Sequence, residues 1–196
     1  MSVPTIYYLR HGQTDWNAAG RFQGSQDIPL NAIGRGQASY VGGVLKNLIA
    51  DTATDLSFVS SPLGRARTTM ELVRSALDLP HHDYALDARL REIGFGSWEG
   101  FTVVQQAADD PAHFAAREAN RWHLPAPGGE SYAEATQRVS DWLSALSGDT
   151  VAVSHGGTAR ALMVALGIET PDSASEVFIE QGVVYMFNAD GLTKVR

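Results

Sequence analysis

Short apolar runs alternate along the chain with longer segments of helical pattern. Four runs predict buried strands, at 5–9 (TIYYL), 56–59, 150–153 (TVAV) and 183–187 (VVYMF). Four helices are predicted at 31–49, from Pro62 to near Pro80, at 131–146, and from just after Gly156-Gly157 to near Gly167. Strands that alternate with helices predict an α/β fold, a three-layer α/β/α sandwich around a mostly parallel central sheet.

Local signals support the predicted helix starts. Asn31 is a good N-cap residue, and Pro62 suits a first helical turn. Ser131 and Glu134 have the spacing of a capping box. We find no repeat and no long linker, and the chain length favours one domain over residues 1–196.

The stretch 101–129 departs from this alternation. It is rich in Ala and Asp and is interrupted by Pro111, Pro125 and Pro127. It is also too long for a simple connection. We predict one or two helices here, packed as an insertion over one edge of the ligand site.

Charged and imidazole side chains follow three of the predicted strands. Arg10 and His11 end the first strand, His155 ends the third, and Arg65 follows the second. In such sheets ligands bind beyond the carboxyl ends of the strands. The guanidinium fork suits phosphate oxygens, and the helix that opens at Gly157 can direct free N–H groups at the same anion. The pattern predicts a phosphate site that contains two imidazoles.

Positive charge near an imidazole lowers its pKa and keeps it neutral and nucleophilic. We therefore predict covalent catalysis through one of the two histidines, His11 or His155, whose titrations should be coupled.

The net charge and the amino-acid composition limit the kinds of partner that the protein can bind. The net charge is 15 − 22 = −7, which argues against nucleic acid or a membrane surface as a partner. A local cationic cluster must then capture any anionic substrate. The absence of cysteine excludes disulfides and thiolate-ligated zinc. No long apolar span or secretory signal is present, so we expect a cytoplasmic protein; the sequence leaves its oligomeric state open, a homodimer included.

Two other classes of protein are alternatives. A nucleotide- or metal-dependent enzyme is disfavoured because no G-x-x-x-x-G-K-[ST] sequence occurs and His81-His82 lacks the HExxH spacing of a helical zinc site. A binding protein that kept the fold without catalysis is the other alternative, and the presence of every expected catalytic residue argues against it.

Five ordered motifs resemble those of the histidine phosphatase superfamily, in its phosphoglycerate-mutase-like branch. They are RHGQTDWNAAGRFQGSQDIPL from Arg10, SSPLGRARTT from Ser60, LREIGFGSWEG from Leu90, PGGES from Pro127, and SHGG from Ser154. The resemblance covers nearly the whole chain. Mild departures, Pro62 where relatives often carry an acidic residue and Gly64 before Arg65, remove no catalytic group.

The resemblance implies a role for each matching residue. His11 would be the nucleophile that becomes a phosphohistidine, and Glu92 would protonate the leaving oxygen and then activate water. No metal or other cofactor would be needed. The transferring phosphoryl group would be bound by Arg10, Arg65, His155, the Gly156 N–H and Asn17, with Gln23 contacting the phosphate or the substrate.

The family contains phosphatases and cofactor-dependent mutases. The spellings EIGFGSWEG and RHGQT are closer to the phosphatases, and only 191–196 follows the last predicted strand, which leaves little chain to cover the site. The sequence thus predicts a phosphomonoesterase acting on a small phosphorylated metabolite, with a phosphoglycerate mutase as the alternative. Arg117 and Arg121, four apart in one predicted helix, could share a face. That face is either solvated or receives a second anionic group of the substrate, and the second reading makes the two arginines candidate substrate-binding residues.

Overall fold

The computed structural model describes residues 4–49 and 52–196. Within these ranges six strands form one sheet, in the order β3-β2-β4-β1-β5-β6. Three of the five strand pairings are parallel. The other two, β1 with β5 and β5 with β6, are antiparallel. The strands are β1 (Ile6–Arg10), β2 (Ser57–Ser60), β3 (Ala85–Leu86), β4 (Thr150–Ser154), β5 (Val184–Asn188) and β6 (Gly191–Val195).

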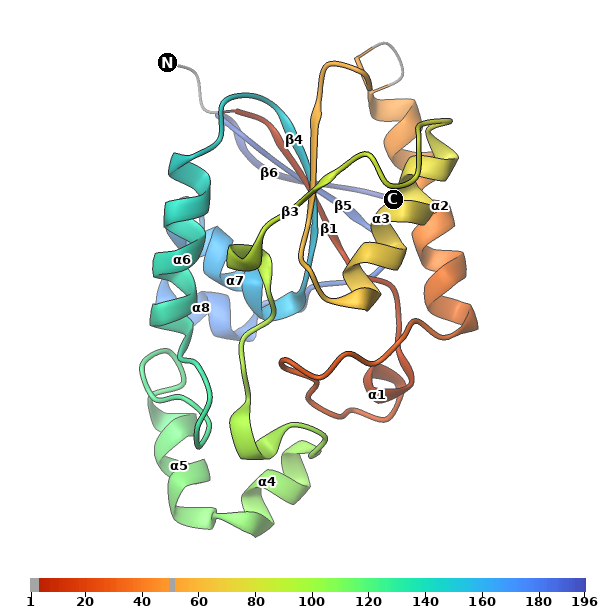
Figure 1. Ribbon diagram of the computed structural model, residues 1–196. Coiled ribbons are helices and arrows are strands. Elements are labelled where there is room, and N and C mark those ends of the chain that lie inside the picture. Colours follow the sequence, from red (N-terminus) through yellow and green to blue (C-terminus); the bar gives the residue numbers. More distant parts are fainter. Residues whose placement is uncertain (1–3, 50–51) are drawn as a thin grey trace.

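Helices cover both faces of the sheet, which confirms the predicted three-layer α/β/α fold. Figure 1 shows α2 and α3 on one face and α6, α7 and α8 on the other, with α4 and α5 beyond one end of the sheet. The longer helices are α2 (Ala32–Ile49), α3 (Gly64–Ala76), α6 (Tyr132–Ser144) and α7 (Gly156–Ala165). The shorter ones are α1 (Asp15–Ala18), α4 (Val103–Asp109), α5 (Pro111–Ala119) and α8 (Pro171–Glu176).

The predicted helix starts are supported by cap geometry. The Asn31 side chain accepts from the Gly34 N–H at 2.9 Å. Ser131 and Glu134 form a reciprocal capping box at the start of α6. These bonds satisfy N–H groups that the first helical turn leaves without partners.

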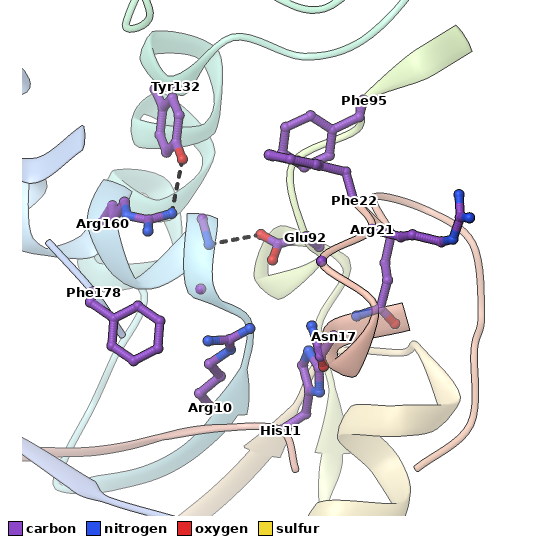
Figure 2. Close-up of a pocket in the computed structure, with 14 residues that line it drawn as sticks. Arg10, His11, Asn17, Arg21, Phe22, Glu92, Phe95, Tyr132, Arg160 and Phe178 are labelled. Atoms are coloured by element: carbon purple, nitrogen blue, oxygen red, sulfur yellow. Dashed lines mark hydrogen bonds between the residues drawn. The ribbon is translucent and has the colours of Figure 1, made fainter. Parts of the chain in front are cut away.

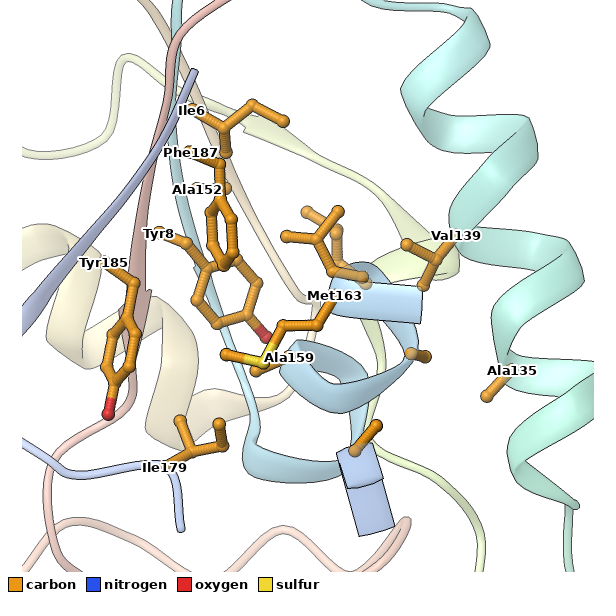
Figure 3. Close-up of a cluster of buried hydrophobic side chains, with 14 of the residues drawn as sticks. Ile6, Tyr8, Ala135, Val139, Ala152, Ala159, Met163, Ile179, Tyr185 and Phe187 are labelled. Carbon is orange, nitrogen blue, oxygen red and sulfur yellow. The ribbon is translucent and has the colours of Figure 1, made fainter. Parts of the chain in front are cut away.

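The core has two parts, one on each face of the sheet. Alternate strand residues point to opposite faces, so Tyr8 packs toward α6 and α7 while Leu9 packs toward α2 and α3. Figure 3 shows the first part, in which Tyr8, Ala152 and Phe187 lie between the strands and α7. This packing fixes the strands, and with them the side chains at their ends.

The register of the two central strands matters most for the site. β1 and β4 run parallel, and Arg10 lies opposite Ser154. The residues that follow, His11 and His155, therefore leave the sheet side by side at its carboxyl edge. The His11 N–H donates to the Ser154 carbonyl at 2.9 Å and holds this alignment.

Two features differ from the sequence predictions. The 191–196 segment is not a free tail, because residues 191–195 form β6 and pair with β5 through a tight turn at Ala189 and Asp190. The two-residue strand β3 was not predicted. Within the described ranges, no helix has both the length and the hydropathy that crossing a bilayer would require.

Candidate active site

His11 lies at the carboxyl end of β1 and is almost completely buried. Its Nδ1 is 2.7 Å from the Gly12 carbonyl oxygen. Because a carbonyl can only accept, Nδ1 carries the ring proton and Nε2 keeps its lone pair. His11 also lines a cavity of about 330 Å³, shown in Figure 2. The ring is thus held in the tautomer that a nucleophile requires.

His155, the N-cap of α7, is fully buried beside His11, with the ring centroids 5.1 Å apart. Its Nε2 lies 2.7 Å from the Ser61 Oγ, and its Nδ1 is buried without a partner among the described residues. Ser61 Oγ also accepts from the Leu63 N–H at 3.4 Å, and among the described residues its hydroxyl proton has no acceptor other than Nε2. That arrangement puts the ring proton of His155 on Nδ1, as a donor.

Two guanidinium groups approach the histidines. Arg65, fully buried in α3, donates from Nη1 to the Gln26 carbonyl at 2.5 Å and from Nη2 to the Gly24 carbonyl at 2.9 Å. Arg10 donates from Nη1 to the Ile179 carbonyl at 2.5 Å. Both Nε atoms are buried without a hydrogen-bond partner among the described residues. Buried donors of this kind are costly unless an acceptor meets them, and an oxyanion beside His11 would supply one.

Electrostatics keep both imidazoles neutral. Burial lowers the pKa of His11 well below its ordinary value, and the charges of Arg65 and Arg10 lower it further. The pKa of His155 is lowered in the same way, first by burial and then by Arg65. The prediction that the histidine pKa is lowered is confirmed, although burial contributes more to the lowering than the neighbouring charges do.

Glu92 reaches the cavity from the segment between the two short 3₁₀ helices Ala88–Leu90 and Gly96–Trp98. Its Oε1 accepts from the N–H groups of Ile93, Gly157 and Thr158 at 3.0, 3.0 and 3.3 Å. A Cβ on Gly157 would lie 2.6 Å from that oxygen, so a larger residue there would displace the Glu92 carboxyl group. Of the N–H groups at the start of α7, that of Gly157 is therefore not free for a phosphate, because it donates to the Glu92 carboxyl group.

Three further predicted groups lie in the cavity. Asn17 Oδ1 accepts from the Thr14 N–H and the Gln181 side chain, at 3.2 and 3.1 Å. Its amide nitrogen therefore has no acceptor among the described residues. The Gly156 N–H likewise has none, and Gln23 buries an unpartnered Oε1. The fold thus brings residues from widely separated motifs to one place.

Arg117 and Arg121 do not line this cavity. Helix α5 ends at Ala119, so Arg121 lies outside it and the expected shared face does not exist. Arg121 donates to Glu118 and Glu176 at 2.5 and 3.0 Å. Arg117 is buried, with its guanidinium 5.8 Å from the centre of the Phe95 ring. The structure therefore places neither residue in the wall of the cavity that contains His11.

The cavity has a cation that the sequence analysis missed. Arg160 lines it, together with Tyr132 and Phe178 (Figure 2). Arg160 lies one helical turn after Gly156, and this four-residue spacing is the signal that could have placed both on one face of α7.

The sequence analysis also missed Glu99. Its side chain anchors the loop 24–26, whose carbonyl groups accept hydrogen bonds from Arg65. Its carboxylate accepts from the N–H groups of Ser25 and Phe95 at 2.8 and 3.2 Å, and from the Gln26 side chain at 3.0 Å. Gly24 has a φ of +53°, and a Cβ there would lie 2.1 Å from the Glu99 carboxylate. Glu99 thereby fixes the two carbonyls, of Gly24 and Gln26, on which the Arg65 guanidinium rests.

Comparison with known proteins agrees with this fold and site. Residues 6–191 match the histidine phosphatase superfamily (branch 1). The chain therefore belongs to the histidine phosphatase superfamily, a class of enzymes that includes phosphatases and mutases.

Similar proteins fall into both groups. A 2,3-bisphosphoglycerate-dependent phosphoglycerate mutase of Methylocella silvestris is 31% identical over 94% of this chain and 93% of its own. A glucosyl-3-phosphoglycerate phosphatase of Mycolicibacterium vanbaalenii is 37% identical over 85% of this chain and 75% of its own. The structure of a mycobacterial glucosyl-3-phosphoglycerate phosphatase in complex with VO3 covers 97% of this chain and 96% of its own, with a TM-score of 0.80 and 29% identity.

Proposed function

We propose that this protein is a phosphatase that hydrolyses small phosphomonoesters through a phosphohistidine at His11. One observation carries the proposal: an imidazole with a free Nε2 lone pair lines the cavity with Arg10, and the positive charges of Arg10 and Arg65 act on it. The Nε atoms of both arginines are buried without acceptors among the described residues. A nucleophile and an oxyanion site at one point suit phosphoryl transfer, in which positioning and positive charge supply most of the catalysis.

In the first step His11 Nε2 attacks phosphorus. The P–N bond forms, the ester P–O bond breaks, and Glu92 gives its carboxyl proton to the leaving oxygen. Arg10, Arg65 and the His155 Nδ1–H stabilise the equatorial oxygens, joined by the Gly156 N–H and the Asn17 amide. Gln23 contacts the phosphoryl group or the substrate beside it.

In the second step a water molecule attacks the same phosphorus. The Glu92 carboxylate takes a proton from the water, the P–N bond breaks, and inorganic phosphate leaves with His11 neutral again. The N–H groups of Gly157 and Thr158 hold the Glu92 carboxyl in place through both steps.

The mutase alternative is favoured by the 31% identity over 94% of this chain to a phosphoglycerate mutase. A mutase must shield its phosphoenzyme from water. Here the edge of the cavity is formed by Phe178, which is 71% exposed, and this favours hydrolysis. An assay with 2,3-bisphosphoglycerate as the phosphoryl donor to phosphoglycerate distinguishes the two activities.

We further propose that the enzyme needs no metal and is of the acid phosphatase type, since arginines supply the positive charge and the lowered pKa of His11 keeps it nucleophilic in acid. The purified protein is expected to release p-nitrophenol from p-nitrophenyl phosphate in excess EDTA, both at neutral pH and just below the ordinary histidine pKa. Loss of activity in EDTA, restored by a divalent cation, would contradict metal independence.

Removal of the Glu99 carboxylate should reduce turnover without removing any group that touches the phosphoryl. In Glu99→Ala, the loop 24–26 loses its anchor and Arg65 is misplaced. We expect kcat for p-nitrophenyl phosphate to fall by about ten- to a hundredfold, as for small misplacements of catalytic groups. Steady-state kinetics and thermal melting on the same preparation separate this loss from unfolding.

Glu99→Gln should recover part of kcat, because an amide oxygen still accepts from the Ser25 and Phe95 N–H groups. Glu118→Ala is the matched control, since its partner Arg121 lies outside the cavity. An unchanged kcat in folded Glu99→Ala would show that the loop does not position Arg65.

A further inference from the structure

Glu92 lies in a stretch of irregular backbone, at 91–95, between the two 3₁₀ helices. Such a stretch lacks the regular bonds that fix the backbone of a helix or a strand, so its carbonyl groups need partners in other elements. A general acid must also stay within hydrogen-bond reach of the oxygen that it protonates. The contacts that hold this stretch therefore decide where the Glu92 carboxyl lies.

The carbonyl groups of residues 89, 90 and 91 each accept a hydrogen bond from a side chain of another element. The donors are, in order, Arg138 Nη1 of α6, Ser154 Oγ at the end of β4, and Thr158 Oγ1 of α7, the last two at 2.7 Å. The Arg138 guanidinium is itself held by the Glu130 carboxylate, at 2.7 and 2.9 Å. Three elements of the fold thus converge on the backbone that leads into Glu92.

Thr158 contacts two successive residues of this part of the chain. Its Oγ1 donates to the Arg91 carbonyl, and its backbone N–H donates to Glu92 Oε1 at 3.3 Å. A threonine in a helix commonly donates to the carbonyl four residues earlier, whereas this hydroxyl donates across to a different element. Thr158 is fully buried, and the Arg91 carbonyl has no other donor among the described residues. Loss of this hydroxyl would therefore release the residue before Glu92.

The two carboxyl oxygens of Glu92 have different surroundings. Oε1 accepts from three backbone N–H groups, two of them at the start of α7, and Figure 2 shows one of these bonds as a dashed line. Oε2 makes no hydrogen bond to the described residues, and Glu92 lines the same cavity as His11. One oxygen is thus held, and the other is left to carry the proton. A shift of residue 91 would move this second oxygen relative to the phosphoryl site.

We propose that Thr158 is a positioning residue for the acid step: with Ser154 and Arg138 it fixes the backbone before Glu92, so that the carboxyl reaches the leaving oxygen. The proposal rests on the phosphatase function above. Thr158 does not line the cavity that contains His11, so its side chain acts on the reaction through Glu92 and not by touching the substrate. Its removal should therefore matter most where the leaving group needs a proton.

Thr158→Val tests this role, because valine keeps the branched shape and the backbone N–H and lacks only the hydroxyl. We expect kcat/KM for glycerol 2-phosphate, whose alkoxide leaves poorly, to fall by about ten- to a hundredfold, as for small misplacements of catalytic groups. For p-nitrophenyl phosphate, whose leaving group needs no proton, the loss should be much smaller. Thr158→Ser keeps the hydroxyl and should recover most of the loss.

Thr150→Val is the matched control. Thr150 is also buried, and its Oγ1 donates to the Gly148 carbonyl at 2.9 Å, but it lies at the start of β4, at the opposite end from the site. This variant should keep the wild-type ratio of kcat/KM for the two esters. Ser154→Ala removes the donor to the Leu90 carbonyl and should show the same selective loss as Thr158→Val. It keeps the proposal testable where Thr158→Val fails to fold.

A double mutant shows whether Thr158 acts through Glu92. Within Glu92→Gln, the addition of Thr158→Val should reduce kcat/KM for glycerol 2-phosphate little further, because the effects of residues that act together are not additive. Losses that multiply in the double mutant, or equal losses for both esters in Thr158→Val and Ser154→Ala, would overturn the proposal while the phosphatase function stands.

Crystal structures of the variants keep the role testable without turnover. We expect the Glu92 carboxyl to lose its contact with the Gly157 N–H in Thr158→Val and to keep it in Thr150→Val. If the wild type hydrolyses neither ester, the phosphatase function fails, and the position of this carboxyl then decides the positioning role alone. A displaced carboxyl in Thr158→Val supports that role, and an unmoved one overturns it.

Discussion

His11→Ala will abolish phosphatase turnover and phosphoryl labelling of the protein. The variant lacks the imidazole that lines the cavity. In that imidazole the Nε2 lone pair is free, because Nδ1 donates to the Gly12 carbonyl. We expect kcat for p-nitrophenyl phosphate to fall by at least about 10⁴-fold, as for loss of other covalent nucleophiles. Rapid acid quench with a ³²P-labelled substrate measures the phosphoenzyme, which is acid-labile if it is a phosphohistidine.

His123→Ala is the matched control, because His123 is exposed and does not line the cavity. It should retain both turnover and labelling. Comparable melting temperatures would show that the smaller side chain at His11 leaves the sheet intact. Acid-labile label that persists in His11→Ala would move the nucleophile to another residue, and His155→Ala would then be tested first.

Glu92→Gln should reduce activity in proportion to the basicity of the leaving group. Glutamine has the same shape, and its amide oxygen can still accept from the Gly157 and Thr158 N–H groups, so the fold of the site is kept. It cannot donate a carboxyl proton. We expect kcat/KM to fall by about 10²- to 10⁴-fold for alkyl phosphates, the usual contribution of general acid catalysis, and much less for p-nitrophenyl phosphate.

Comparison of kcat/KM with kcat distinguishes the two steps of the reaction. The value of kcat/KM reports phosphorylation of His11, where the leaving group departs, while kcat also contains hydrolysis of the phosphoenzyme. Because Glu92 also takes a proton from water, Glu92→Gln should show a burst of p-nitrophenol followed by slow turnover. Equal losses of kcat/KM for alkyl and aryl phosphates would remove the acid role from Glu92.

The sequence predicts the framework of the site well, for a physical reason. His11, His155 and Arg65 follow short apolar runs directly, and the end of a strand is set by local pattern and by the geometry of a parallel sheet. The four predicted strands and the four long helices are confirmed. The hairpin of β5 and β6 was missed, although the Asp190-Gly191 dipeptide after a strand is a turn signal.

The part of the cavity around Arg160 and the supports of the site were harder to predict. Its residues are positioned by tertiary contacts, which local pattern does not encode. Arg160 is oriented by the Val177 carbonyl and the Tyr132 hydroxyl, both distant in sequence. Arg121 was misplaced because the helix was expected to continue past Ala119, where the chain instead turns. The carboxyl of Glu99 holds the loop whose carbonyls accept from Arg65, and no sequence spacing reveals such an indirect contact.

Because β1 pairs with β4, the site cannot form until most of the chain has been synthesised. His11, the proposed nucleophile, follows β1 near the start of the chain, and His155 follows β4 more than a hundred residues later. A growing polypeptide on the ribosome therefore carries His11 without the surroundings that make it reactive. Reactivity toward phosphate esters is acquired only when nearly the whole chain has been synthesised and its two distant parts have met.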